Sequence, residues 1–426
     1  MTEGPAEHRL AARLLAAGVV HPKPSGRPPT LGLDDLTMVI PVHNDAAGLS
    51  NLLPALAAEG ETTSRCHQVI VVDDGSSPAE AARLEKLLDQ YAITMLRNNA
   101  AMGPAAARNR GAAIVTTRLV GFVDADVHPT EGWLDALLWH FDNPSVTLVA
   151  PRVRAMPGSS VVDRYEAVGS PLDLGPRPGL IKPQSRISYV PGAAMVMRTA
   201  TFNQLDGFDE ALRAGEDVDL VWRVGEQPDS LARYEPRGTV HHRNRQSLTA
   251  FSRQRHLYGS ATAPLEHRHP GWLSPVVINK WSAAVVALPV LLGRRGLGVG
   301  AMVAIASAAT MVPKIRDRVD QPVSDAMRLG LRGHLHAAEM VANAAWRDWL
   351  PATVVAAAVS PRVRRAAAVA ALAPAAAEWL RDPPSLDPVR YAALRTLDNA
   401  SHGAGVITGL IGAQSIKAVL PRWTSA

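Results

Sequence analysis

Cysteine is almost absent from this 426-residue sequence, in which Cys66 stands alone. A single thiol cannot form an intrachain disulfide, and it cannot supply the several thiolates of a multi-cysteine zinc site. The N-terminal stretch opens with acidic residues, and Arg13 interrupts its apolar residues, so it does not resemble a signal peptide. These features favour a catalytic domain in a reducing, cytosol-facing environment.

The sequence also lacks internal repeats, and its low complexity is limited to alanine enrichment. With 47% hydrophobic and 19% charged residues, the composition excludes a disordered protein and leaves room for one large catalytic domain plus a second region. The net charge of +5 suits an anionic partner such as a nucleotide, an acidic membrane surface or a nucleic acid. Charge alone does not choose among these partners.

Strand and helix signals alternate after a Pro/Gly-rich linker that ends near residue 32. The expected strands cover residues 36–44, 68–77, 92–99 and 118–127, and the expected helices between them cover residues 45–58, 78–91 and 103–115. Such alternation predicts an α/β fold with a doubly wound, mostly parallel sheet. Ligands of these sheets bind beyond the carboxyl ends of the strands. We therefore expect the polar residues at three strand ends to converge on one crevice, namely Asn44, Asp73, Asp74, Asp124 and Asp126.

Two carboxylates end the fourth expected strand in "GFVDADVHP", residues 121–129. Asp124 and Asp126 can both approach a divalent cation, and Mg²⁺ or Mn²⁺ held in this way commonly carries a diphosphate. A solvated acidic turn is the alternative. The strand end "VVDDGSS" offers Asp73 for a nucleotide base or ribose, while a turn and a helix cap are the alternative there, especially for Asp74.

A third acidic group, Glu216 and Asp217, opens an expected helix in "GEDVDLVWR". An acidic first turn is ordinary helix chemistry, but it can also aim Asp217 as a general base towards an acceptor hydroxyl. Further along, His241 and His242 follow a short strand. A neutral imidazole can complete a Mn²⁺ shell, although each histidine taken singly is more often structural.

The composition changes after about residue 270, where two apolar runs cover residues 275–292 and 296–313. Each run is near the lower length limit for a membrane-spanning helix, and "GRRG" joins them. They predict a transmembrane hairpin, helices lying in the membrane interface or a packed helical appendage. The arginine pair at the tip fits the positive-inside rule poorly if the catalytic domain is cytosolic.

Six motifs occur in an order and spacing that resemble glycosyltransferase family 2. They are "MVIPVHN", "VIVVDDGSS", "GPAAARNRG", "FVDADV", "VPGAAMVMRTATFNQLDGFDEAL" and "GEDVDLVWR". The resemblance implies the GT-A fold, which binds a nucleotide-sugar and a divalent metal, and for inverting members a single displacement step. It also implies three regions: an N-terminal helix and linker (1–32), the catalytic domain (33–270) and a helical, membrane-associated region (271–426).

The resemblance also implies a role for each matching residue. Asp73 would contact the uracil of the donor, and Arg108 or Asn109 would lie near the donor. A basic R-x-R element would close over the diphosphate. Asp126 would bind Mn²⁺ or Mg²⁺ directly with Asp124 nearer the donor, and His241 would join them. Asp217 and Glu216 would be the catalytic residues, with Asp217 as the base. The donor-binding residues are then Pro41, His43, Asp73, Asp74, Arg108, Asn109, Asp124, Arg253 and Arg255.

A narrower similarity, to mycofactocin-system glycosyltransferases, lies in "RYEAVGSPLDLGPRPG", "SYVPGAAMVMR" and "YGSATAPLEHRHPG". It implies transfer of glucose from UDP-glucose to a peptide-derived redox cofactor or its precursor, building a β-linked glucan, with no nucleic acid involved. Members usually carry a small additional N-terminal peptide-binding-like domain, of which only residues 11–24 match the end. This departure leaves the acceptor open, with a lipid or cell-envelope polysaccharide as the alternative. The expected location is the cell membrane, with the catalytic domain facing the cytoplasm.

"FVDADV" also fits the signature of haloacid-dehalogenase-type phosphatases, in which Asp124 would be the phosphorylated nucleophile. Those enzymes need that aspartate on the first strand, whereas three α/β units precede it here. The phosphatase interpretation also leaves "VVDDGSS" without a role. A non-catalytic membrane scaffold is a further alternative, against which the intact acidic motifs argue.

Overall fold

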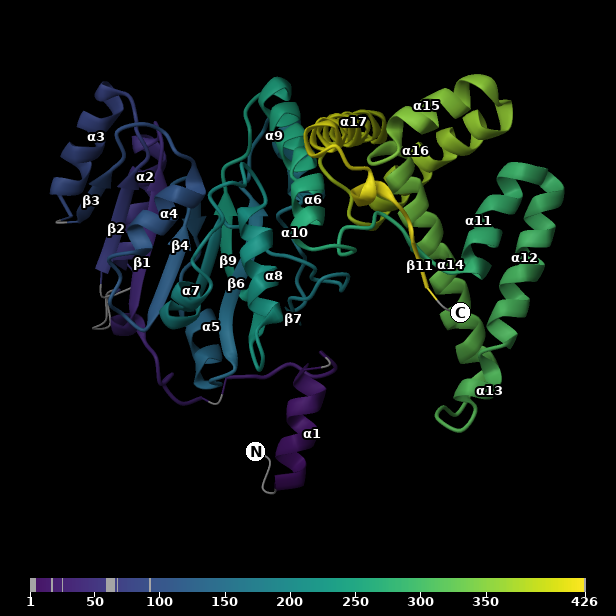
Figure 1. The fold of residues 1–426 in the computed structure, drawn as a ribbon, viewed down its shortest axis with the longest axis horizontal. Coiled ribbons are helices and arrows are strands. Elements are labelled where there is room, and N and C mark those ends of the chain that lie inside the picture. The colour runs from purple at the N-terminus through teal and green to yellow at the C-terminus, as the bar shows by residue number, and fades with distance from the viewer. Residues whose placement is uncertain are drawn as a thin grey trace. The chain divides into compact units, whose positions relative to one another are not determined.

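The computed structural model describes residues 5–16, 18–24, 26–58, 66, 68–91 and 93–424. It forms two compact units, Met1–Asn244 and Arg245–Ala426 (Figure 1). The helices of the first unit are α1 (Pro5–Ala16), η1 (Leu33–Asp35), α2 (Ala46–Ala58), α3 (Pro78–Asp89), α4 (Pro104–Ala112), α5 (Asp135–Leu138), η2 (Trp139–Asp142), α6 (Val161–Gly169), α7 (Thr199–Gln204) and α8 (Glu216–Glu226). Its strands are β1 (Leu36–Val42), β2 (Gln68–Asp73), β3 (Thr94–Arg97), β4 (Leu119–Val123), β5 (Val127–Pro129), β6 (Val146–Ala155), β7 (Gly179–Leu180), β8 (Ala194–Arg198) and β9 (Leu231–His242).

A nine-stranded mixed sheet runs through the first unit, in the order β3-β2-β1-β4-β8-β6-β9-β5, with β7 paired to β9. The first four strands of this order are parallel, β8 is antiparallel to both of its neighbours, and β6 and β9 are parallel to each other. This arrangement confirms the predicted doubly wound α/β sheet, but the sheet is mixed, because four of its eight described strand pairings are antiparallel. The carboxyl ends of β1, β2 and β4 consequently meet at one edge.

The side chains of β1 alternate between two hydrophobic cores, as expected for a strand covered on both faces. Met38 and Ile40 pack with leucines of α2 and α3, whereas Val39 packs with alanines of α4 and with Leu220 of α8. Asp45 begins α2 as predicted, because its Oδ1 accepts a hydrogen bond of 3.0 Å from the Gly48 amide. These helices hold the loops at the strand ends in place.

The described part of the second unit is helical apart from a two-stranded parallel pair formed by β10 (Val277–Ile278) and β11 (Arg422–Trp423). Its helices are α9 (Leu248–Ser260), α10 (Thr262–Arg268), α11 (Lys280–Leu292), α12 (Arg294–Ala309), α13 (Val312–Ile315), α14 (Pro322–Trp346), α15 (Leu350–Val359), α16 (Pro361–Arg381), α17 (Pro388–Ala413) and η3 (Lys417–Val419). Gly259 of α9 and Gly405 of α17 let these two helices approach closely, because a Cβ at either position would overlap backbone of the other helix. The division between the units therefore lies before α9, earlier than the predicted boundary at residue 270.

One helical stretch among the described residues, Arg294–Ile315, is long and apolar enough to cross a membrane, with a mean hydropathy of 1.6. The other arm of the predicted hairpin, α11, has 13 residues and falls short of this length.

Gly111 provides a test of how α4 packs on the sheet. A Cβ at this position would overlap Val39 Cγ1 and lie 3.0 Å from Val72 Cγ2. We expect Gly111→Ala to lower the free energy of unfolding by about 1–3 kcal/mol, the usual cost of overpacking a core. In the control Gly225→Ala, on exposed α8 surface with no atom within 4 Å, the change should be a gain of about 0.5–1 kcal/mol. Urea unfolding of both variants measures the difference, and equal effects would contradict this packing.

Candidate active site

Backbone hydrogen bonds fix the loop that carries Asp124 and Asp126 between β4 and β5. The Asp124 amide donates to the Ala193 carbonyl at 3.0 Å, and the Asp126 carbonyl accepts from the Arg243 amide at 3.1 Å. Gly48 of α2 lies against this loop, since a Cβ there would come within 2.9 Å of the Ala125 carbonyl oxygen. Both aspartate side chains keep part of their surface exposed and lie at the edge where ligands of such sheets bind.

Asp124, Asp126 and His242 form a group that could hold a metal ion. One ligand atom from each of the three residues lies within 4.8 Å of the other two. His242 Nε2 is 3.4 Å from Asp126 Oδ1. Two carboxylate oxygens with one imidazole nitrogen suit Mn²⁺, and the carboxylates alone suit Mg²⁺. The donor set therefore fits the divalent cation predicted from the sequence.

The assignment of His241 to this group was wrong, and its neighbour His242 takes the place. Successive side chains of a strand point to opposite faces, so only one of the two histidines can face Asp126. His241 pairs with His128 across β5 and β9. Burial lowers the pKa of His241, and the charge of Arg154 and the neighbouring His128 lower it further. The motif "HH" signalled a ligand, but the strand register that decides between the two is not legible in the sequence.

Arg108, on α4, joins the metal-binding loop to the start of α8. Its buried guanidinium donates hydrogen bonds to Asp124 Oδ1 at 2.6 Å, to Glu216 Oε1 at 2.9 Å and to the Gly192 carbonyl at 3.4 Å. Burial alone would lower the pKa of Arg108, but the charges of Asp124 and Glu216 outweigh it and raise the pKa. The guanidinium is thus a permanent cation between two carboxylates. Glu216, which was expected beside the base, orients Arg108.

Asp217 lies in the first turn of α8, where two backbone amides hold its carboxylate. The Gly192 amide donates to Oδ2 at 2.6 Å and the Val218 amide donates to Oδ1 at 2.8 Å. A Cβ on Gly192 would lie 3.1 Å from Asp217 Cβ, so glycine lets the backbone reach the carboxylate. Burial and the charge of Glu216 raise the pKa of Asp217 to about 7, although both amides and Arg108 oppose the rise. A carboxylate with this pKa is suited to general-base catalysis near neutral pH.

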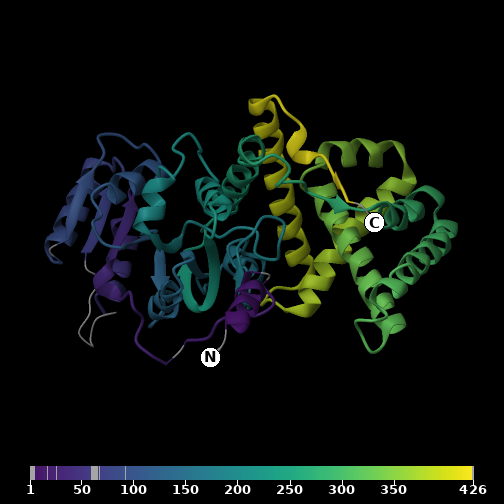
Figure 2. The same ribbon diagram turned by 60° about the horizontal axis from the view of Figure 1, so that its bottom comes forward.

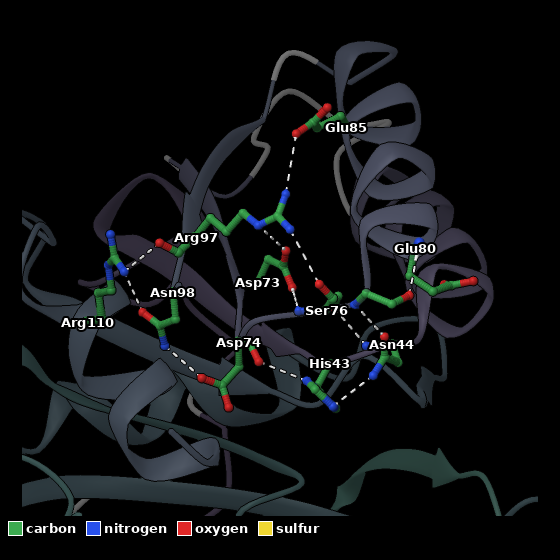
Figure 3. Close-up of polar contacts among 11 residues, drawn as sticks. His43, Asn44, Asp73, Asp74, Ser76, Glu80, Glu85, Arg97, Asn98 and Arg110 are labelled. Carbon is green, nitrogen blue, oxygen red and sulfur yellow. Dashed lines mark hydrogen bonds and ion pairs between the residues drawn. The ribbon is translucent and has the colours of Figure 1, made fainter. Parts of the chain in front are cut away.

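The ends of β1 and β2 are tied together by a polar network (Figure 3). His43 Nδ1 donates to the Asp74 carbonyl at 2.8 Å, which leaves Nε2 to accept from Asn44 Nδ2 at 2.8 Å. The Asn44 amide donates to Ser76 Oγ, and Asn44 adopts a left-handed backbone with φ 53°. His43 remains exposed beside the strand ends, and its donor contact stays a prediction.

The predicted ligand contact of Asp73 is contradicted by its environment (Figure 3). Its side chain has no exposed surface, accepts a hydrogen bond of 2.9 Å from the Ser76 amide and lies 3.3 Å from Arg97 Nε. Asp74 accepts from Asn98 Nδ2 at 2.7 Å and from the amides of residues 102 and 103 at 2.9 and 2.8 Å. Both aspartates thus build the turn, which was the alternative interpretation.

Asn109, the alternative to Arg108 at the donor, points to another part of the unit. It donates to the Phe208 carbonyl and to Glu210 Oε1, both at 2.9 Å, and accepts from the Phe208 amide. It therefore holds the loop that precedes α8. Pro41 is partly exposed near the end of β1.

Arg253 and Arg255 belong to α9 and hence to the second unit. Arg255 is 2% exposed, pairs with Asp398 at 3.1 Å and stacks its guanidinium 4.6 Å from the Phe251 ring centroid. These contacts assign Arg255 to packing within that unit, contrary to its predicted role at the diphosphate. Arg253 is exposed, and its donor contact stays a prediction.

Comparison with known proteins agrees with this geometry. The model of glycosyl transferase family 2 matches residues 37–202. The pre-mycofactocin glycosyltransferase of Mycobacterium tuberculosis is 38% identical over 424 residues, which cover 97% of this chain and 87% of that protein. The chain belongs to glycosyltransferase family 2. Its first unit has the GT-A fold, and the phosphatase interpretation falls away.

Two further similarities are more distant. The succinoglycan biosynthesis protein ExoU of Rhizobium meliloti is 29% identical over 199 residues, which cover 45% of this chain and 56% of that protein. The structure of the mannosyltransferase PcManGT from Pyrobaculum calidifontis, in complex with GDP-Man and Mn²⁺, is 18% identical with a TM-score of 0.46. The match covers 95% of this chain and 94% of the mannosyltransferase chain.

The two adjacent histidines allow a matched test of the metal site. We expect His242→Gln to weaken Mn²⁺ binding at least about tenfold. Losing a residue that only hydrogen-bonds to a metal ligand already weakens metal binding by about this factor. His241→Gln should bind Mn²⁺ as the unaltered protein does, because its ring lies on the other face of β9. Calorimetric titration of the purified protein with Mn²⁺ measures both. Equal weakening by the two variants would refute the assignment of His242.

Arg108 allows a test of the buried charge network. Arg108→Gln leaves Asp124 and Glu216 without their shared cation, so we expect a loss of about 3–5 kcal/mol in the free energy of unfolding. Arg83 is the control, because it pairs with Glu80 at 2.6 Å on the surface and its side chain is 72% exposed. Arg83→Gln should cost at most about 1 kcal/mol. Chemical denaturation at neutral pH distinguishes the two, and similar costs would rule out a special role for Arg108.

Proposed function

We propose that this glycosyltransferase is an inverting, metal-dependent enzyme that transfers glucose from UDP-glucose to mycofactocin or its peptide-derived precursor, forming a β-linked oligosaccharide. The observation that carries the proposal is the linkage of the metal-binding loop to Asp217 through Arg108 and Gly192. It brings a cation site and a carboxylate of pKa about 7 to one edge of the sheet. These are the two groups that a single displacement on a nucleotide-sugar requires.

Asp124, Asp126 and His242 would hold Mn²⁺ or Mg²⁺, which when bound offsets the charge of the departing diphosphate. Arg108 keeps Asp124 in place. Asp217 accepts the proton of the acceptor hydroxyl as its oxygen forms a bond to the anomeric carbon of the sugar. The bond from that carbon to the diphosphate oxygen breaks in the same step, so UDP leaves with the bonding electrons and the anomeric configuration inverts.

The acceptor and donor rest on similarity. The Mycobacterium tuberculosis relative matches 97% of the length of this chain. Its name supports a mycofactocin precursor as acceptor. UDP-glucose follows from the resemblance to mycofactocin-system enzymes. A lipid or cell-envelope polysaccharide is the second candidate acceptor, favoured by the large apolar residues that the helical unit exposes, including Leu297, Met302 and Ile305. Both acceptors fit an enzyme at the cytoplasmic face of the cell membrane, attached peripherally or integrally through residues 271–426.

The pKa of Asp217 sets the pH dependence that we expect. A base works in its ionised form, so kcat/KM should fall about tenfold per pH unit below the pKa of Asp217 and level off above it. This pKa is about 7 without a metal, and a bound cation lowers it. Asp217→Asn should lower kcat by about 10²–10⁴-fold while it leaves UDP-glucose and Mn²⁺ binding intact. Release of UDP at saturating Mn²⁺, with the mass of the acceptor as second readout, measures both effects.

Three outcomes would contradict parts of the proposal. Normal transfer by Asp217→Asn would remove the base assignment, and transfer in the presence of a chelator would remove the metal. A panel of nucleotide-sugars tested on a mycofactocin precursor and on a lipid acceptor identifies the sugar and the acceptor by mass. Transfer to the lipid alone would favour the second candidate.

A further inference from the structure

Helix α12 exposes an apolar face in the helical unit. Met302 and Ile305 lie on this outward face with 62 and 53% of their surface exposed, and Val299 borders it with 36% exposed. Gly296, Gly300, Ala304 and Ser307 recur on the opposite, buried side. An amphipathic helix normally turns its large apolar residues inward, and α12 does the reverse. Its outward face is therefore built for an apolar environment other than the protein core.

The buried side of α12 is held against α11 and α14, so the orientation of the outward face is fixed. Gly296 lies against the Leu288 carbonyl of α11, and a Cβ on Gly330 of α14 would come 2.8 Å from Ala308 Cβ. The buried imidazole of His334 on α14 is 2.7 Å from Ser307 Oγ and 2.9 Å from Ser282 Oγ. One side chain thus ties three helices together, which resists rotation of α12 about its axis.

Basic residues lie at both ends of this apolar face. Arg294 and Arg295 begin α12. Lys314, Arg316 and Arg318 follow in and after α13, where Asp317 and Asp320 offset part of their charge. Residues 280–381 contain 13 Lys and Arg against six Asp and Glu. Cations flanking an apolar stripe complement the anionic headgroups above a hydrocarbon layer.

The same packing argues against a membrane-spanning hairpin. The 13 residues of α11 extend about 20 Å, whereas the hydrocarbon core is about 30 Å thick. Crossing by α12 would also carry α14 into the hydrocarbon, where Arg328 and Arg332 are exposed. A helix lying in the plane of one leaflet meets neither difficulty.

We propose that the outward face of α12 docks in the plane of an anionic lipid bilayer, entering one leaflet without crossing it. This inference deepens the membrane association proposed above and decides between its peripheral and integral forms. It does not depend on the sugar, the acceptor or the metal, so the transfer chemistry and the docking can fail independently. The occupant of the face is the lipid surface, and a second copy of the chain is the competing occupant.

The test is flotation of the full chain with vesicles of equal parts phosphatidylcholine and phosphatidylglycerol, compared with phosphatidylcholine alone. We expect binding to the anionic vesicles that alkaline carbonate releases. Met302→Glu with Ile305→Glu should weaken it more than tenfold, and Arg294→Gln with Arg295→Gln should weaken it about fivefold per arginine, the factor for about 1 kcal/mol per cation. The control pair is Val389→Glu with Ile411→Glu.

The control residues are 76 and 72% exposed on α17, which lies on the other side of the helical unit from α12 (Figures 1 and 2). The control pair should bind vesicles as the unaltered chain does, and far-ultraviolet circular dichroism checks that every variant is folded. Retention after carbonate treatment would overturn the proposal in favour of a spanning helix. Failure to bind either vesicle, with a dimer in light scattering that the α12 variants abolish, would overturn it in favour of a second copy.

Discussion

The arrangement of the active site depends on the buried guanidinium of Arg108. It joins the carboxylates of Asp124 and Glu216, which lie 16 and 108 positions further along the chain. Two carboxylates at a sheet edge would repel each other and open the site, whereas one shared cation holds them together. Because Asp217 follows Glu216 directly, fixing Glu216 also fixes Asp217, the proposed base. The loop of Asp124 and Asp126 and the proposed base are consequently placed by one side chain of α4.

A second constraint is the close approach of backbone to side chain at two glycines. Gly192 presents both its amide to Asp217 and its carbonyl to Arg108, so it connects the base and the cation through one residue. Gly48 lets α2 lie against the Ala125 carbonyl in the middle of the metal-binding loop. A larger residue at either position would shift one catalytic element relative to the other, which matters because transfer needs the base and the metal at fixed separation.

The fold could be predicted from the sequence because it follows from local patterns. The same patterns pointed to the carboxylates of the candidate site, whose roles stay predictions. Alternating apolar runs gave the strands and helices, and carboxylates at strand and helix ends marked Asp124, Asp126 and Asp217. Choices that depend on tertiary packing were not accessible. Whether His241 or His242 faces the metal depends on the strand register, and whether Asp73 is exposed depends on Arg97 and the turn at Ser76. Arg255 was misassigned because its partner, Asp398, lies 143 residues further along the chain.

The charge balance of the site explains why the base and the metal belong together. Asp124, Glu216 and Asp217 surround one guanidinium, so the cluster holds more negative than positive charge, and part of that excess raises the pKa of Asp217. A divalent cation at Asp124 and Asp126 would draw on the same carboxylates and relieve the excess, which favours the ionised form of Asp217. Metal binding would therefore lower the pKa of the proposed base as well as offset the charge of the leaving group. Arg108 links the two effects, because it contacts both Asp124 and Glu216.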